Sequence, residues 1–583
     1  WPFCRAGFQP KKSEIEKGVD RMIKIYDTMS RDLREFVPIE DGKVKMYVCG
    51  PTVYNYIHVG NARSTVAFDT IRRYFEYRGY EVAYISNFTD VDDKIINRAK
   101  EEGITPLEVA DKYIAAFRED VTALGVKPAT RHPRVVEFMA DIIRFVEDLI
   151  EKGFAYESQG DVYFRVEKSH NYAKLANKTL EDLELGASGR TDEETARKEN
   201  PVDFALWKAA KPGEISWDSP WGPGRPGWHI ECSVMSTEIL GDTIDIHGGG
   251  ADLEFPHHTN EIAQSEAKTG KTFANYWMHN GFVNIDNVKM SKSLGNFITV
   301  HDALKTLDGQ VLRFFFATQH YRKPINFTEK AVRDAETNLK YLKNTYEQPF
   351  SGTVDAQELQ AFKDKFIAAM DEDFNAANGI TVVFEMAKWI KSGHYNQKVK
   401  DTLKNMLEVF GIDLKNIKNT KNTNYNEGLD EFYTTRLSRM LENYSWSKYN
   451  QKYILEDLKD YFHNEYEVIT LSSTRSEQIH DKFMKAISNE PKPSSVLMIV
   501  NGNQKPSVLQ ALRNCKEVSF GMEIKFDYQF IYNINEKQKK LIQKRQEARA
   551  NRDFATADQI RDQLAAQGIK LLDTKDGVRW TRD

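Results

Sequence analysis

The spacing of apolar and polar residues changes along the chain, and each change marks a different kind of element. A strand-like run at 43–54 ("KVKMYVCGPTVY") ends in a Gly/Pro turn, a helical pattern follows at 61–79, and a second strand-like run comes at 80–89. Strand, helix and strand in this order are typical of a parallel sheet, whose ligands bind beyond the carboxyl ends of the strands. The pattern predicts an α/β fold.

This pattern is interrupted and then resumes. Residues 150–223 form a Gly-, Glu- and Lys-rich excursion, after which "RPGWHIECSVMSTEIL" (225–240) and "TIDIHGGGADLEFPHH" (243–258) again combine turns with strand-like runs. An insertion that splits one Rossmann-type nucleotide-binding fold explains this order best. From Glu329 to Phe410 the spacing is helical with little strand signal, which predicts a helical bundle.

The last third of the chain has a different composition. From residue 413 to about 535 it is enriched in Asn, Tyr, Lys and Ile. Within it, 494–502 ("SSVLMIVNG") and 518–534 are strand-like and 476–487 is helix-like, so we expect a small folded α/β or α+β unit whose role the residues do not name. The chain then ends in a charged helical pattern followed by a short pair of strands.

The segment before Met22 lacks a periodic apolar face. Its residues Lys17, Gly18 and Val19 can be encoded by a sequence that contains a bacterial ribosome-binding site, a short distance before the Met22 codon. We therefore expect residues 1–21 to be a translated leader or extension outside the fold. Mass spectrometry of the native protein that found residue 1 intact would refute this.

Composition narrows the class of protein. The chain has 583 residues, of which 40% are hydrophobic and 29% charged, as in globular multidomain proteins. No apolar run approaches the roughly 20 residues of a membrane helix, and no signal peptide is apparent, so we expect a cytoplasmic protein without membrane contact. Four scattered cysteines cannot form a disulfide framework, and a net charge of −5 leaves nucleic-acid contacts to local basic patches.

The stretch 255–261, "FPHHTNE", has the spacing of a metal site. On a helix, His257 and Glu261 fall four residues apart on one face, while His258 points elsewhere. The alternative is a polar helix start with Pro256 in its first turn, because short His/Glu motifs also arise by chance.

Two further motifs suit phosphate chemistry. "CGPTVYNYIHVGNAR" places His58 and Asn61 around Gly60 where a strand turns into a helix, so that helix N-terminal amides and the imidazole can face a phosphate. In "NVKMSKSLGN", Lys289 and Lys292 lie three apart among small residues and can neutralise the charge on a triphosphate. Alone, the second motif is equally typical of a solvated basic loop.

Together, "HVGN" and "KMSKS" on a split nucleotide-binding fold with a following bundle resemble the class I aminoacyl-tRNA synthetases. With "NFTDVDDKI", "GWHIECS" and "IHGGGADLEFPHHTNE", the order of motifs resembles the bacterial cysteinyl-tRNA synthetase family over residues 22–412 and 536–583. One departure is Asn61, where the class signature most often has a second histidine; an Asn amide can still donate to phosphate.

The resemblance implies one zinc per subunit, held by Cys49, Cys232, His257 and Glu261. Two thiolates, an imidazole and a carboxylate suit Zn²⁺. In this family the zinc is understood to bind the thiol of the substrate cysteine and so to reject serine, which shape alone separates by only about 10². The excursion at 150–223 is too short to suggest an editing domain.

The resemblance also implies the rest of the active site. Thr89, Trp228 and His247 should line the cysteine pocket, with His229 nearby, although His229 and His247 could also be structural histidines. Gly248 to Gly250 should let the backbone approach the adenosine. The residues expected to act in catalysis are His58, Asn61, Lys289 and Lys292, with Mg²⁺ on the phosphates, and those expected to bind ATP are Gly60, Gly249, Asp252 and Lys292. Asp252 should hold either the ribose or the substrate amine.

For tRNA, the stretch "KQKKLIQKRQEARANR" supplies a local basic face, although such a run is also typical of a solvated helix. The resemblance implies that Arg549, Asp558 and Asp573 contact the anticodon and that Trp580 offers a stacking surface.

These expectations combine into one function: ATP-dependent activation of L-cysteine and its transfer to the 3′ end of tRNA(Cys) by a monomer. The alternative activates cysteine without charging tRNA, like the ligase that joins cysteine to an amino sugar in mycothiol synthesis, or is a regulatory relative. The expected divisions are a leader (1–21), the first half of the Rossmann catalytic domain (22–149), a connective insertion (150–223), the second half (224–272), a KMSKS-containing stem-contact region (273–328), the bundle (329–412), an atypical inserted unit (413–535) and an anticodon-binding domain (536–583).

Overall fold

The structure is a computed structural model of the whole chain. It describes residues 22–178, 195–285, 297–415 and 417, the strands 288–289, 467–471, 495–501, 525–531, 569–574 and 577–582, helical positions at 484, 541, 544–545 and 548–549, and residues 553–565. The chain divides into two units, Trp1–Asn284 with Ile298–Tyr425, and Ile285–Phe297 with Asn426–Asp583, and each is described by itself.

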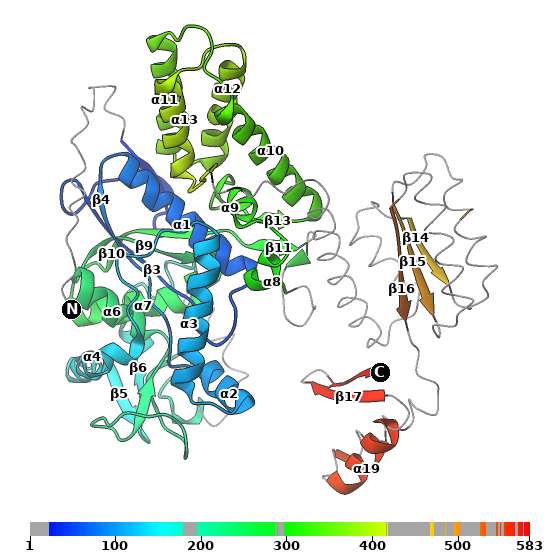
Figure 1. Cartoon of the computed structure of the whole chain (residues 1–583). Coiled ribbons are helices and arrows are strands. Elements are labelled where there is room, and N and C mark those ends of the chain that lie inside the picture. Colours follow the sequence, from blue (N-terminus) through cyan, green and yellow to red (C-terminus); the bar gives the residue numbers. More distant parts are fainter. Residues whose placement is uncertain are drawn as a thin grey trace, which may run out of the picture. The chain divides into compact units, whose positions relative to one another are not determined.

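A four-stranded parallel sheet forms the centre of the first unit, as the strand-helix-strand pattern predicts (Figure 1). Every residue of β9, one of its two inner strands, is buried except the last, which is expected for a strand covered on both faces. The last strand, β10, lies beyond residue 272 and so extends the sheet past the division expected there. In spatial order the strands are β10 (Ala274–Asn280), β9 (Ile244–Gly250), β3 (Lys43–Val48) and β4 (Glu81–Ile85).

The helices around this sheet begin and end at the residues that local physics favours. Thr105 and Glu108 form a reciprocal capping box at the start of α3, whose first residue is Pro106, and Gly103 ends α2 in the left-handed conformation. The helices are α1 (Val59–Tyr77), α2 (Asp93–Glu102), α3 (Pro106–Ala123), α4 (Met139–Glu151), α6 (Ile230–Leu240) and α7 (Thr259–Thr269).

The excursion between the two halves of the sheet has a sheet of its own. Its four strands are antiparallel neighbours in chain order, and Trp207 and Phe164 from them enter the same hydrophobic core as Trp277 of the central sheet. The strands are β5 (Ala155–Ser158), β6 (Asp161–Phe164), β7 (Phe204–Ala209) and β8 (Gly224–Pro226). At the N-terminal end of the described chain, β1 (Lys24–Asp27) and β2 (Asp32–Glu35) form an antiparallel hairpin.

The rest of the first unit is mainly helical, as its spacing predicts. Each of the four long helices has a side-chain N-cap, from Thr328, Asp355, Asn375 and Asn396 in turn. The elements are α8 (Val300–Leu304), α9 (Gly309–Ala317), β13 (Ile325–Phe327), α10 (Glu329–Glu347), α11 (Ala356–Asp371), α12 (Ala376–Lys391) and α13 (Gln397–Val409). The short strand β11 (Val283–Ile285) precedes them in the chain, and β12 (Val288–Lys289) belongs to the second unit.

The second unit has three parallel strands, and two of them confirm the strand predictions at 494–502 and, for residues 525–531, at 518–534. The strand at 467–471 was not predicted. The predicted helix at 476–487, apart from position 484, and the strand-like residues 518–524 and 532–534 lie outside the described residues. The elements are β14 (Glu467–Leu471), β15 (Ser495–Asn501) and β16 (Lys525–Ile531), then α19 (Phe554–Ala565) and the antiparallel pair β17 (Ile569–Thr574) and β18 (Gly577–Arg582). Among the described helices of both units, none is long and apolar enough to cross a bilayer.

Candidate metal centre and nucleotide site

Four side chains expected as metal ligands converge beyond the carboxyl end of the central sheet. Cys49 follows β3, Cys232 lies in the first turn of α6, His257 lies in the irregular turn before α7, and Glu261 lies in the first turn of α7. The Cys49 Sγ atom lies 3.7 Å from Cys232 Sγ and 3.3 Å from Glu261 Oε1, and His257 Nε2 lies 3.1 Å from the same oxygen. All four ligand atoms fall within 4.8 Å of one another, so one ion can bind them together.

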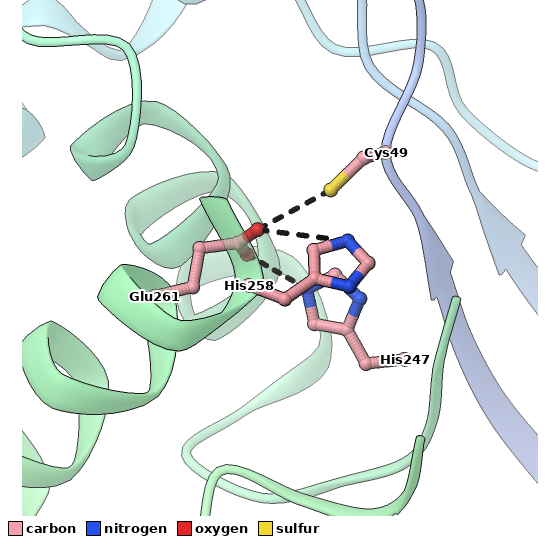
Figure 2. A group of neighbouring side chains, drawn as sticks. All are labelled: Cys49, His247, His258 and Glu261. Atoms are coloured by element: carbon pink, nitrogen blue, oxygen red, sulfur yellow. Dashed lines mark hydrogen bonds and ion pairs between the residues drawn. The ribbon is translucent and has the colours of Figure 1, made fainter. Parts of the chain in front are cut away.

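A second group shares Cys49 and Glu261 with the first and adds His247 and His258 (Figure 2). His247 Nε2 lies 2.7 Å from Glu261 Oε2, whereas His258 Nε2 lies 4.0 Å from Oε1. The first group offers a metal two thiols and the second only one, so a soft ion such as Zn²⁺ favours the first. In that arrangement, His247 holds the ligand carboxylate by its other oxygen.

His258 was expected to point away from the site, and that expectation is wrong. Residues 254–258 form a single π-helical turn in which Phe255 is not helical, so ideal helix spacing does not apply to them. His258 is fully buried, and its Nδ1 lies 2.7 Å from His279 Nε2 on β10. The irregular turn therefore brings a second imidazole toward Glu261.

Burial sets the charge state of the cluster. It raises the pKa of the Cys49 thiol well above its usual value, and it lowers the pKa of His257 to about 3, so this imidazole is neutral and can bind a metal. Burial also opposes ionisation of Glu261, but His247 and His257 outweigh it and lower the pKa of this carboxyl. Buried thiols, neutral imidazoles and an ionised carboxylate fit a divalent cation, because the cation itself stabilises thiolates.

The residues expected around the substrate cysteine lie beside this cluster. The Trp228 ring is 40% exposed and its centroid lies 4.4 Å from that of His257, while His229 Nδ1 lies 3.0 Å from His257 Nδ1. Thr89 is buried just beyond β4, and its hydroxyl donates to Glu231 Oε2 over 3.1 Å. Trp228 therefore gives the cluster a partly exposed aromatic neighbour.

The residues expected to bind phosphate form the first turn of α1. The Asn61 amide N–H donates to His58 Nδ1, and the His58 amide N–H donates to Asn61 Oδ1, each over 3.2 Å. This is a capping box in which histidine takes the usual Ser/Thr position, so Asn61 has a structural reason to replace a second histidine. Gly60 lies between them in the same turn.

The backbone after the KMSKS motif pairs with the turn that holds His58. The Val59 amide donates to the Ile298 carbonyl over 3.0 Å, and the Val300 amide donates to the Ile57 carbonyl over 2.8 Å. Lys289 lies in β12, where only the backbone is described, and Lys292 lies outside the described residues. Residues 298–300 thus pair with the turn that begins α1.

The three glycines that end β9 have crowded surroundings. A Cβ at Gly248 would lie 2.4 Å from the Phe68 ring, and one at Gly249 would lie 2.8 Å from Leu253. A Cβ at Gly250 would lie 2.4 Å from Asp252 Oδ1. The chain therefore turns tightly from β9 into the short 3₁₀ turn that carries Asp252.

The expected anticodon residues lie in the second unit. Arg549 is exposed at a helical position, and Asp558 on α19 accepts a 2.7 Å hydrogen bond from Arg561 Nη1. Asp573 lies in β17 opposite Val578, and Trp580 lies in β18 opposite Leu571. For the last two residues, the structure describes only the backbone.

Sequence reasoning missed Glu231, which is fully buried next to Cys232. A carboxylate inside the apolar start of α6 is a usable signal, since acidic residues are rarely fully buried. His279 was also missed, and no motif in its own segment marks it.

Models of known families match three stretches of the chain. The model described as "tRNA synthetases class I (C) catalytic domain" matches residues 35–337, the "DALR domain" matches 365–415, and the "Cysteinyl-tRNA ligase anticodon binding domain" matches 534–580.

Curated relatives match almost the whole chain. A cysteine--tRNA ligase of Streptococcus pneumoniae serotype 4 is 74% identical over 562 residues, which are 96% of this chain and 100% of that relative. One from Streptococcus mutans serotype c is 62% identical over the same shares. A solved structure, Mycobacterium tuberculosis methionyl-tRNA synthetase in complex with methionyl-adenylate, matches with 15% identity and a TM-score of 0.47 over 63% of this chain and 88% of that chain.

The streptococcal matches bear on the inserted unit. Because they cover 96% of this chain, they run through residues 413–535, most of which fall between two family models. The unit is therefore shared with these relatives and is not peculiar to this chain.

Proposed function

We propose that this chain, which belongs to the cysteine--tRNA ligase family, activates L-cysteine with ATP and transfers the cysteinyl group to the 3′ end of tRNA(Cys). The observation that carries the proposal is the close group of two thiols, an imidazole and a carboxylate, whose Cys49 lies at the end of β3 on the connection that leads to the first turn of α1. This donor set suits sulfur recognition next to a phosphate site.

Cys49, Cys232, His257 and Glu261 would hold one zinc ion, which supplies a soft centre that prefers sulfur to a hydroxyl oxygen. The protein residues do the rest of the selection. His247 orients the Glu261 carboxylate, and Trp228 and Thr89 flank the place where a cysteine would lie. A hydrophobic pocket alone would separate cysteine from serine by only about 10².

Activation needs no protein nucleophile. The cysteine carboxylate attacks the α-phosphorus of ATP in line, and pyrophosphate leaves; the terminal ribose hydroxyl of tRNA then attacks the adenylate and releases AMP. The protein accelerates activation by aligning the cysteine carboxylate with the α-phosphorus and by stabilising the negative charge on the phosphates. His58 and the Asn61 side-chain amide would serve the phosphates together with Lys289, Lys292 and Mg²⁺, and Gly60, Gly249 and Asp252 would bind the nucleotide.

Residues of the C-terminal part would read the anticodon. Arg549 and Asp558 are exposed on helices, as contacts to unpaired bases require. Asp573 would join them from β17. We further propose that the chain acts as a monomer in the cytoplasm. Its domains would follow the sequence patterns, except that the second half of the Rossmann catalytic domain extends through β10.

The test is transfer of labelled cysteine onto bacterial tRNA(Cys) by the full chain, with serine as the control amino acid. Charging with cysteine alone supports the proposal. Exchange of pyrophosphate into ATP with cysteine, but no charging, would restrict the function to activation, and no cysteine-dependent exchange would refute it.

Two single substitutions, one of them a control, test the role of Lys292. Lys292→Ala should lower the rate of activation far more than it weakens cysteine binding, while Lys388→Ala, on the exposed side of α12, should change neither. An unchanged activation rate in Lys292→Ala would contradict the assigned role.

A further inference from the structure

Glu231 is a buried carboxyl group to which the reaction above assigns no role. Its side chain is 0% exposed in the first turn of α6. Its Oε2 accepts the 3.1 Å hydrogen bond from Thr89 Oγ1, while its Oε1 has no hydrogen-bond partner among the described residues. A buried acid with one oxygen unsatisfied is costly, and its presence next to a metal ligand calls for a functional reason.

Thr89 connects Glu231 to the two cysteine ligands. Asn87 Nδ2 donates to Thr89 Oγ1 over 3.3 Å, and Asn87 Oδ1 accepts from the Gly50 amide over 2.9 Å and lies 3.7 Å from Cys232 Sγ. Gly50 follows Cys49, and a Cβ there would lie 1.7 Å from the Asn87 carbonyl oxygen, so only glycine fits. One chain of hydrogen bonds thus joins the turns after β3 and β4 to α6.

These contacts determine what the Thr89 hydroxyl can offer a ligand. A hydroxyl has one proton and two lone pairs. The proton goes to Glu231 and one lone pair accepts from Asn87, which leaves a single lone pair for a donor. A bound cysteine has only one donor besides its thiol, the α-ammonium group.

We propose that Glu231 is a positioning residue for cysteine binding, which holds the Thr89 hydroxyl so that it accepts a hydrogen bond from the substrate ammonium group. The proposal rests on the proposed function and names a residue that acts on the substrate through Thr89. Without an acceptor at position 231, the hydroxyl would rotate to find another partner for its proton and would no longer be held as an acceptor.

The experiment compares Glu231→Met, which keeps the length but removes the acceptor, with Glu231→Gln, whose amide oxygen can still accept from Thr89. KM for cysteine, KM for ATP and kcat are measured by pyrophosphate exchange, and zinc content is measured by metal analysis. Glu231→Met should raise KM for cysteine about 10- to 100-fold, the range for a hydrogen bond to a charged group, with KM for ATP and zinc content unchanged. In Glu231→Gln, KM for cysteine should stay within about 3-fold of the value of the unsubstituted chain, because the amide oxygen still accepts from Thr89.

Two controls separate positioning from a general structural role. Glu238→Met, at an exposed position of the same helix, should leave all values unchanged. In a Thr89→Val background, Glu231→Met should add less than about 2-fold to KM for cysteine, because the hydroxyl it positions is absent. If Glu231→Met loses zinc or does not fold, Glu231→Asp, which withdraws the carboxyl by one methylene, takes its place under the same criteria.

Three results would overturn the proposal: an unchanged KM for cysteine in the acceptor-free variant, equal damage in Glu231→Gln, or an undiminished effect in the Thr89→Val background. Each of these results counts against the proposal only if the unsubstituted chain shows cysteine-dependent pyrophosphate exchange. An unsubstituted chain without cysteine-dependent exchange would instead refute the proposed function.

Discussion

Two ion pairs of nearly equal length show how differently charge is used in the two units. Asp69 on α1 lies 2.6 Å from Arg313 on α9, and both side chains are buried. Asp558 lies 2.7 Å from Arg561 on α19, with side chains that are 59% and 47% exposed. The distances are alike, but water surrounds only the second pair, so only the first depends on its partner for stability.

The buried pair belongs to a region where side chains replace water. Burial alone would raise the pKa of Asp69, but Arg313 and Arg73 outweigh it and lower the pKa below its ordinary value of 3.8. The same balance of burial against close partners governs Glu261 in the metal cluster. The Asp69 and Glu261 carboxylates of the first unit are therefore held by their neighbours, while Asp558 and Arg561 on α19 remain exposed to water.

The largest effect is expected at the proposed zinc ligands. Cys232→Ser should lose zinc and lower cysteine activation by roughly 1,000-fold, since a metal centre supplies several kcal/mol. Zinc analysis and pyrophosphate exchange measure this. Removing zinc from the unsubstituted chain with a chelator should cause the same loss, and adding zinc back should reverse it; full activity without zinc would show that the cluster does not serve the reaction.

The second-largest effect is expected when Arg313 loses its buried partner, Asp69. Asp69→Asn should leave the Arg313 guanidinium uncompensated and lower the free energy of unfolding by about 3–5 kcal/mol at pH 7. Because the folded pKa of Asp69 is lowered, its contribution is present above pH 3.8 and is lost as the pH falls through the folded value. Denaturant unfolding at pH 7 and pH 3 should therefore show a smaller difference between variant and parent at the lower pH.

The first turn of α1 should show an intermediate effect. Asn61→Ala removes half of the capping box around His58, so it should lower the free energy of unfolding by about 1 kcal/mol and slow activation. Asn61→Asp keeps the cap acceptor but loses the amide donor, so it should recover stability without recovering the rate. Equal activation rates in the two variants and the unsubstituted chain would show that Asn61 does not act on the phosphates.

The smallest effect on stability is expected at the exposed pair. Asp558→Ala should change the free energy of unfolding by less than about 1 kcal/mol, because exposed ion pairs contribute little. It should still raise KM for tRNA in the charging assay while leaving pyrophosphate exchange unchanged. Arg561→Ala serves as the matched control, since it breaks the same pair without removing the carboxylate. A large loss of stability in either variant would erase the contrast between the two units.

Much of the fold could be predicted from local pattern. The strands at 43–48 and 81–85, the helix between them, and the bundle after Glu329 follow from apolar spacing, Gly/Pro turns and capping residues, all of which act within a few neighbours in the chain. The four expected metal ligands came from the order of the motifs, because nothing in the spacing between Cys49 and Cys232 indicates that they meet.

Only the tertiary structure decided how the site is completed. His247 and His258 lie close to Glu261, and His279 contacts His258, because parallel strands bring distant segments to one edge and because an irregular turn at 254–258 replaces ideal helix geometry. Glu231 and Thr89 are 142 positions apart in the chain, and they meet only because the fold brings α6 next to the turn after β4. Local physics determined the elements; packing between remote elements determined which polar groups lost water and therefore had to find one another.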